Sequence, residues 1–323
     1  MSTAATTEKL PFFLRGNYAP VDEERTITSL RVDGEIPRTL AGSYLRNGPN
    51  PRDTTPPHWF FGDGMLHGIA IEDGRALWYR NRWIQTRQLR EHARVIRPDG
   101  TRDLTAGPGN TNVIRHAGRI LALAETSKPW EVTDELETVG SYDFDGRLAT
   151  GMTAHPKVCP TTGEMHFFDY NWFAPYVTYH CADAAGRLVR SVPIEVPGPT
   201  MMHDFAITAG HVLIMDLPVV FDVERAMRGV MPYRWDDAYG ARVGVMKRGD
   251  DSGTLRWFDV DPCYVFHPMN AYDDGDRIVV DVARYPELWR EDSGRFDLAS
   301  LHRWDFNLAA GGVRETALDD RPI

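Results

Sequence analysis

The sequence predicts an all-β protein built as a propeller, and three observations carry this prediction. Glycine and proline are frequent, with 28 and 22 residues among 323, which is typical of a chain with many tight turns. Aromatic residues make up 11% of the chain and favour short β-strands. A strand–turn–strand pattern recurs along the chain at related intervals, as in the blades of a propeller.

Five segments carry this pattern, and each has an apolar strand, a glycine-containing turn and a second strand rich in β-branched or aromatic residues. The segments begin at His67, Asn112, His155, His203 and His267. Their turns are expected at Asp73-Gly74, Ala117-Gly118, Thr162-Gly163, Ala209-Gly210 and Asp274-Gly275. Successive starts lie 45, 43, 48 and 64 residues apart, close to the roughly 40–50 residues of a blade. A β-sandwich with coincidental spacing is the alternative.

The organisation of the chain indicates one domain. No linker rich in serine or glycine divides the sequence, so we expect residues 1–323 to form a single domain. The segment that best suits a helix is Val220–Gly229, between Pro218 and Pro232. It falls in the longest interval, with the polar segment Lys247–Gly253, and we interpret this interval as an insertion between blades.

Charge and composition argue against several classes of protein. The 36 basic and 46 acidic side chains give a formal net charge of −10, so no nucleic-acid partner is expected. No apolar run reaches the roughly 18–20 residues of a membrane-spanning helix, and the first residues do not read as a secretory signal. We therefore expect a cytoplasmic protein. Its three cysteines are scattered and form no CxxC pair, unlike zinc ribbons and disulfide frameworks.

Four of the five repeated segments begin with a histidine, and His67 sits at the start of the first segment much as the other three do in theirs. If blades surround an axis, His155, His203 and His267 converge there. Imidazole is the commonest transition-metal ligand at neutral pH, and a shell of histidines suits Fe(II) or Zn(II). The sequence therefore predicts a metal site, and the alternative is that each histidine caps its strand through a hydrogen bond.

Glu125 follows the second strand of the Asn112 segment. Metal-bound imidazoles usually donate their other ring N–H to a carboxylate or a carbonyl group. Glu125 is therefore a candidate partner for one of the three histidines, with a solvated surface carboxylate as the alternative. The sequence lacks the GxSxG, Walker A and HExxH motifs of other enzyme classes.

Seven stretches of the sequence resemble the carotenoid cleavage oxygenases, a family that includes the retinoid isomerohydrolase and lignostilbene dioxygenases. These stretches occur in the family's order and cover nearly the whole chain. They are Gly16–Val21, Gly34–Pro51, His58–Gly68, Tyr79–Trp83, Thr153–Lys157, Met201–Thr208 and Phe266–Tyr272. Several motifs in the same order identify a family far more specifically than any single motif does.

The resemblance implies a seven-bladed propeller with iron, Fe(2+), held on its axis by four histidines. His155, His203 and His267 match three of these ligands, and Glu125 matches a glutamate that supports them. The implied reaction is the cleavage of a conjugated C=C bond of a carotenoid or apocarotenoid by O2, which gives two carbonyl products. The implied partners are an apolar polyene and O2, with peripheral membrane contact because carotenoids partition into bilayers.

The chain departs from the family pattern near its end. The family's fourth histidine lies beyond residue 323, and His302 does not match its motif. The motifs give His67 no ligand role either, and we expect it to pack near the channel. We therefore expect a chain truncated at its C-terminus, with an incomplete propeller of about five to six blades in which Leu301–Leu318 begins a further blade.

Two alternative functions remain open. One is a lignostilbene-type dioxygenase, whose members tend to carry a lysine before the glutamate and a tyrosine upstream. Ala124 and Trp83 occupy those positions here and favour an apolar polyene. The other is a non-catalytic remnant that binds polyenes without iron.

Apolar residues around the expected helix predict a membrane-facing patch, with ordinary core packing as the alternative. The patch consists of Phe173, Val219, Val220, Phe221, Met227, Val230 and Met231.

Overall fold

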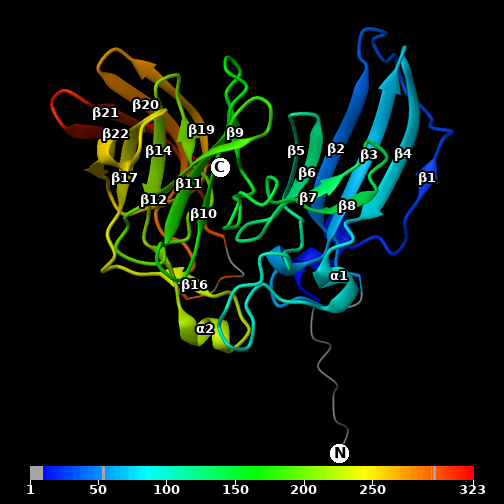
Figure 1. Ribbon diagram of the computed structural model, residues 1–323, viewed down its shortest axis with the longest axis horizontal. Helices are drawn as coiled ribbons and strands as arrows, with labels where there is room; N and C mark the ends of the chain where they lie inside the picture. The colour runs from blue at the N-terminus through cyan, green and yellow to red at the C-terminus, as the bar shows by residue number, and fades with distance from the viewer. Residues whose placement is uncertain (1–9, 53–54, 292, 294–295) are drawn as a thin grey trace, which may run out of the picture.

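Figure 1 shows the computed structural model, in which β-sheets stand side by side and short helices lie at one end. The structure describes residues 10–52, 55–291, 293 and 296–323. Within these ranges the chain forms five four-stranded sheets and one separate strand pair, and neighbouring strands are antiparallel. The prediction of a mostly β protein is confirmed.

The sheets follow one another along the chain. The first sheet has the order β1–β4–β3–β2 and contains β1 (Thr26–Ile27), β2 (Gly42–Pro49), β3 (Gly64–Glu72) and β4 (Arg75–Trp83). The second contains β5 (Asn112–His116), β6 (Arg119–Leu123), β7 (Trp130–Val132) and β8 (Thr138–Ser141). The third contains β9 (Lys157–Val158), β10 (Met165–Tyr170), β11 (Val177–Ala182) and β12 (Leu188–Ile194). The fourth contains β13 (Ala206–Ile207), β14 (His211–Asp216), β17 (Arg242–Lys247) and β18 (Arg256–Asp259). The fifth contains β19 (Tyr264–Asp274), β20 (Arg277–Tyr285), β21 (Ser300–Asn307) and β22 (Gly312–Pro322).

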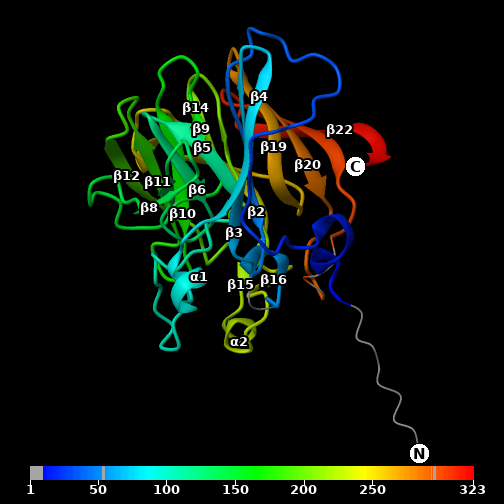
Figure 2. The same cartoon turned by 90° about the vertical axis from the view of Figure 1, so that its right-hand side faces the viewer.

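The remaining elements are short. The separate pair joins β15 (Val219–Phe221) to β16 (Tyr233–Trp235). The α-helices are α1 (Arg87–Glu91) and α2 (Val223–Met227). The 3-10 turns are Phe12–Leu14, Gly16–Tyr18, Trp59–Phe61 and Ser252–Thr254. Figures 1 and 2 show α1 and α2 at the same end of the molecule.

Each predicted strand–turn–strand segment forms an antiparallel hairpin in the structure. Both residues of the Asp73-Gly74 turn have positive φ, at 45° and 73°, and so do those of Ala117-Gly118, at 48° and 80°. Two consecutive residues with positive φ match the right-handed twist of the flanking strands, and glycine adopts this conformation without steric cost.

The first hairpin does not correspond to the other four. Strands β5, β9, β13 and β19 lie at the end of their sheets, whereas β3, which carries His67, is second from the end and β2 takes the end position. The Asn47 side chain on β2 donates hydrogen bonds to the carbonyl oxygens of Gly109 and Asn112, at 2.6 and 2.8 Å, so β2 lies beside the start of β5. The expectation that His67 occupies the repeated position is therefore wrong. Any two adjacent strands of an antiparallel sheet have the same sequence pattern. The pattern alone therefore cannot show which strand lies at the end of the sheet.

The expectation of a further blade at Leu301–Leu318 is also wrong. Strand β21 pairs with β20 along its whole length, and β22 pairs with β21, so both complete the fifth sheet. The long connection Pro286–Ala299 between β20 and β21 separates the hairpin from these outer strands and made them look like a new repeat.

The predicted helix is shorter than expected. The Asp222 side chain accepts a hydrogen bond from the Arg225 N–H at 3.0 Å, so α2 begins only after Asp222. Val219 and Val220 belong to β15, and both are buried, as is Met231. These three residues therefore lie in the core and do not belong to a membrane-facing patch.

None of the helices in the described ranges is both long and apolar enough to cross a bilayer. The first residues, which do not read as a secretory signal, lie partly in residues 1–9, outside the described part of the chain. Cys159, Cys181 and Cys263 are buried and free of disulfides.

Candidate metal centre

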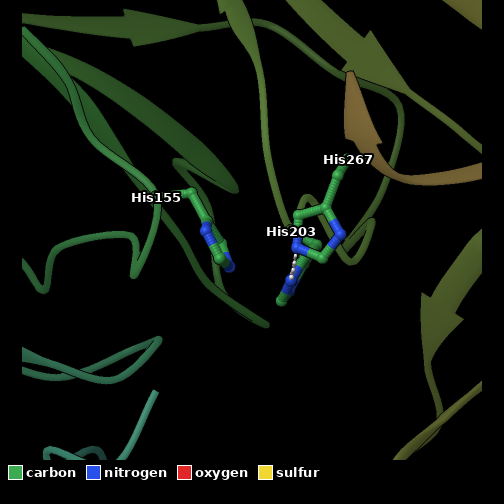
Figure 3. A group of neighbouring side chains, drawn as sticks. All are labelled: His155, His203 and His267. Carbon is green, nitrogen blue, oxygen red and sulfur yellow. Dashed lines mark hydrogen bonds between the residues drawn. The ribbon is translucent and has the colours of Figure 1, made fainter. Parts of the chain in front are cut away.

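Three histidines, from the segments at the start of three different sheets, lie close together (Figure 3). His155 lies two residues before β9, His203 lies three residues before β13, and His267 lies in β19. One ring nitrogen of each lies within 4.8 Å of the other two, and the Nε2 atoms of His203 and His267 are 3.2 Å apart. Since metal–nitrogen bonds are about 2.0–2.1 Å long, small side-chain shifts would let all three nitrogens bind one ion.

Hydrogen bonds between neighbouring sheets bring these segments together. The Asn112 amide at the start of β5 donates to the carbonyl oxygen of Ala154 at 2.8 Å. The Thr153 hydroxyl donates to the carbonyl oxygen of His203 at 3.2 Å, and the Tyr264 hydroxyl donates to that of Met201 at 3.1 Å. Because these contacts lie at or just before the first strands of the sheets, the histidines there face a common centre.

The donor set fits a transition metal. The Nε2 atom of His155 is buried and has no hydrogen-bond partner among the described residues. Leaving such a group unpaired costs about 1–3 kcal/mol, and a metal ion at the centre of the cluster would pair with it. Burial, with the neighbouring histidines, lowers the pKa of His155 to about 2 and that of His267 to about 4. Both imidazoles are therefore neutral at pH 7 and have a lone pair to offer.

Glu125 lies two residues beyond β6 and contacts Nδ1 of His203 through Oε1. Burial lowers the pKa of His203, but the Glu125 carboxylate outweighs it, so the pKa is raised overall. The Tyr170 hydroxyl donates to the other carboxylate oxygen of Glu125. Burial raises the pKa of Tyr170 well above its usual value, so this hydroxyl keeps its proton and stays a donor. Tyr170, Glu125 and His203 thus form a chain that orients the His203 ring.

The other histidines considered in the sequence do not join the cluster. His67 contacts the Tyr79 hydroxyl through Nδ1 at 2.9 Å, and Nδ1 of His302 lies 3.3 Å from the Ser300 hydroxyl. Over the ranges that the structure describes, the three-histidine cluster is the only group of three or more potential ligand side chains.

Aromatic side chains adjoin the cluster on one side. Phe266 lies edge-on to the His203 ring, with centroids 5.2 Å apart, and also contacts Trp289 and Phe296. Phe60 packs against Trp289 at 6.1 Å. These side chains make the surroundings of the cluster apolar on that side.

Sequence reasoning missed two groups at this site. Tyr170 lies on β10, and no pattern in the sequence connects it with Glu125. Lys157 and Asp204 form an ion pair of 2.7 Å beside the histidines, and Asp204 is only 2% exposed. Each follows a predicted histidine ligand within two residues, so the sequence could have indicated that both lie near the site but not that they pair.

A family model described as "Retinal pigment epithelial membrane protein" matches residues 18–323. A carotenoid cleavage oxygenase of Mycobacterium tuberculosis is 42% identical in an alignment 376 residues long. The alignment covers 99% of this chain and 75% of that protein. The carotenoid 9,10(9′,10′)-cleavage dioxygenase of Crocus sativus is 37% identical, over 84% of this chain and 56% of its own length.

Solved structures show the same architecture. The lignostilbene dioxygenase of Pseudomonas brassicacearum superposes with a TM-score of 0.84 at 29% identity, covering 97% of this chain and 72% of its own. The cobalt-substituted Synechocystis ACO superposes with a TM-score of 0.79 at 23% identity, covering 94% of this chain and 71% of its own. The second likeness supports the fold alone.

Proposed function

The chain belongs to the carotenoid cleavage oxygenase family, and from that premise we propose that it uses Fe(II) and O2 to cleave a conjugated C=C bond of a carotenoid or apocarotenoid. The products are two carbonyl compounds. The observation that carries the proposal is the meeting of three imidazoles, two of which are neutral at pH 7, beside the aromatic ring of Phe266. The chain is thus an enzyme of the carotenoid cleavage dioxygenase class, and the metal, the co-substrate and the polyene are the proposed parts.

The roles of the residues follow from their contacts. His155, His203 and His267 would hold the iron, whose chemistry is the activation of O2 beside an electron-rich alkene. Glu125 keeps the His203 ring oriented, and Tyr170 keeps Glu125 in place. Phe266 excludes water from one side of the cluster and offers an apolar surface to the substrate.

We also propose that residues 1–323 act as one domain of the family's seven-bladed type, to which the described residues contribute five four-stranded sheets. The family's fourth histidine matches no position in residues 1–323. Neither His67 nor His302 lies in the cluster, so neither is proposed as a ligand.

Ala124 and Trp83 support a polyene over a phenolic stilbene. Ala124 is buried and brings no amino group to the site. Trp83 is buried, and its indole N–H donates to the carbonyl oxygen of Asn50 at 3.0 Å, so it offers no free donor to a phenol.

Exposed apolar side chains near α2 support peripheral contact with a membrane. Val223 and Met227 on α2 are 62% and 85% exposed, and Phe173 and Val230 are also exposed. A polyene dissolved in a bilayer would reach an enzyme docked there.

The test is metal and product analysis of the purified chain, loaded with iron under anaerobic conditions. We expect about one iron per chain and paired carbonyl products from apocarotenals after exposure to air, with both lost in His155→Ala. Polyene binding without iron would favour the non-catalytic alternative. Cleavage of stilbenes but not of apocarotenals would favour a stilbene dioxygenase.

A further inference from the structure

Two side-chain contacts tie the segment of His155 to the segment of His203, one on each side of His155. Thr153 lies two residues before His155, and Lys157 lies two residues after it. Both contacts cross from the third sheet to the segment that leads into the fourth sheet. The side chains of Thr153 and Lys157 are therefore both directed toward the segment of His203.

The first tie is the Thr153 side chain, which is 1% exposed. Its hydroxyl donates to the backbone carbonyl oxygen of His203 at 3.2 Å and accepts a hydrogen bond from the backbone N–H of His155, also at 3.2 Å. A single oxygen atom therefore joins the backbones of two of the clustered histidines.

The second tie is the ion pair between Lys157 and Asp204, residues that are 28% and 2% exposed. The Lys157 ammonium lies 2.7 Å from Oδ1 of Asp204, and the same oxygen accepts the backbone N–H of Phe205 at 2.8 Å. The carboxylate is thus held on its own segment, directly after His203, and the lysine is drawn to a fixed point.

His155 depends on such ties more than His203 does. The Glu125 carboxylate orients the His203 ring, whereas no carboxylate among the described residues lies within ion-pair distance of His155. The position of its unpaired Nε2 atom therefore follows from the placement of its backbone. A displacement of about 1 Å is enough to spoil a preorganised site.

We propose that Thr153 and the Lys157–Asp204 ion pair are positioning residues that set the distance between the metal-binding nitrogens of His155 and His203. This inference rests on the proposed metal site and assigns to it residues that are not ligands.

Charge alone predicts the opposite result for Lys157, so the two effects can be separated. The Lys157 ammonium is close enough to lower the pKa of both His155 and His267, and it repels a cation bound between them. If charge dominated, removing this ammonium would strengthen metal binding. If positioning dominates, Lys157→Met weakens metal binding although a repulsive charge has gone.

The experiment is a titration of the metal-free full chain with Co(II), followed by the visible absorption of the bound ion, with thermal unfolding of each metal-free variant. We expect Lys157→Met and Thr153→Val each to weaken Co(II) binding about 10-fold and to alter the absorption bands. Thr153→Ser retains the hydroxyl and is expected to bind within about 2-fold of the wild type. In the double variant Lys157→Met/Asp204→Asn we expect no further loss beyond Lys157→Met, since both changes break one contact.

The matched control is Arg242→Met. Arg242 and Asp216 form an ion pair of 2.8 Å whose side chains are 29% and 1% exposed, nearly the values of the Lys157 pair, but it lies within the fourth sheet. This variant is expected to lower the unfolding temperature without changing Co(II) binding.

Several results would overturn the proposal. Wild-type affinity and absorption in folded Thr153→Val and Lys157→Met, or tighter binding in Lys157→Met, would refute positioning while leaving the metal site intact. An equal loss in Arg242→Met would show that general destabilisation causes the effect. A wild-type chain that binds no Co(II) or Fe(II) would refute the metal site, and the positioning role with it.

Discussion

Glu125 shows how one carboxylate can orient a histidine of the cluster. It accepts the Tyr170 hydroxyl on one oxygen and contacts Nδ1 of His203 with the other, so the ring presents Nε2 to the centre of the cluster. A carboxylate in this place also raises the basicity of the imidazole, which strengthens its bond to a metal.

We expect Glu125→Gln to weaken iron binding about 10–100-fold, because the amide carries no charge to match the ring N–H. Iron titration of the metal-free chain measures this. Glu131→Gln is the control, since Glu131 is 21% exposed against 17% for Glu125 and pairs with Arg119 away from the histidines. Iron affinity that is equal in Glu125→Gln and the wild type would contradict this role.

His180 makes the fold sensitive to acid. Burial lowers its pKa to about 4 from an ordinary value near 6.5, and its ring contacts the hydroxyls of Thr150 and Ser191, each at 2.8 Å. Between these pH values the unfolded chain binds a proton that the folded chain does not, so stability is full above about pH 6.5 and falls as the pH drops toward 4.

The loss amounts to roughly 3 kcal/mol at most, from about 1.4 kcal/mol per pKa unit. We expect His180→Gln to remove this part of the acid sensitivity. Unfolding temperatures of the metal-free wild type and variant, compared from pH 7 to pH 4, should converge as the pH falls. Two curves that stay parallel would show that His180 does not contribute.

At the scale of elements, α2 and its surroundings separate buried from exposed apolar residues. Strand β15 buries Val219 and Val220, whereas α2 leaves Val223 and Met227 exposed at the end of the molecule shown in Figure 2. An exposed apolar patch on the surface of a protein is typical of a contact site for a membrane or another protein.

We expect Val223→Asp and Met227→Asp each to reduce binding to phosphatidylcholine vesicles about 10-fold, because each loses apolar contact and places a charge at the interface. Co-sedimentation measures the bound fraction. Val189→Asp on β12 is the control, since Val189 is 56% exposed. The proposal of membrane contact fails if all three variants bind the vesicles as the wild type does.

At the scale of the whole molecule, the proposed metal site depends on three neighbouring sheets. His155, His203 and His267 are separated by 48 and 64 residues of sequence, and their nitrogens still lie within 4.8 Å of one another. The segments at the start of the third, fourth and fifth sheets would each supply one ligand, so no single sheet would hold the metal alone.

We expect His155→Ala, His203→Ala and His267→Ala each to abolish iron binding at micromolar concentrations, since two imidazoles are a weak site. His67→Ala and His302→Ala should retain the iron content of the wild type, because neither residue lies in the cluster. Metal analysis after desalting measures this. Loss of iron in His67→Ala, or its retention in His203→Ala, would contradict the assignment.

The sequence by itself determined the β class, the hairpins with their turns, the three histidines and Glu125 as candidates, because strand alternation and turn chemistry act over a few neighbouring residues. Tertiary structure alone decided which strand ends the first sheet, and so excluded His67, and it assigned β21 and β22 to the fifth sheet. It also decided that Val219, Val220 and Met231 are buried, and it brought Tyr170 to Glu125 and Lys157 to Asp204. These outcomes depend on which strands and sheets are neighbours. Such packing joins residues that are far apart in the chain, and their pairing produces no pattern among neighbouring residues of the sequence.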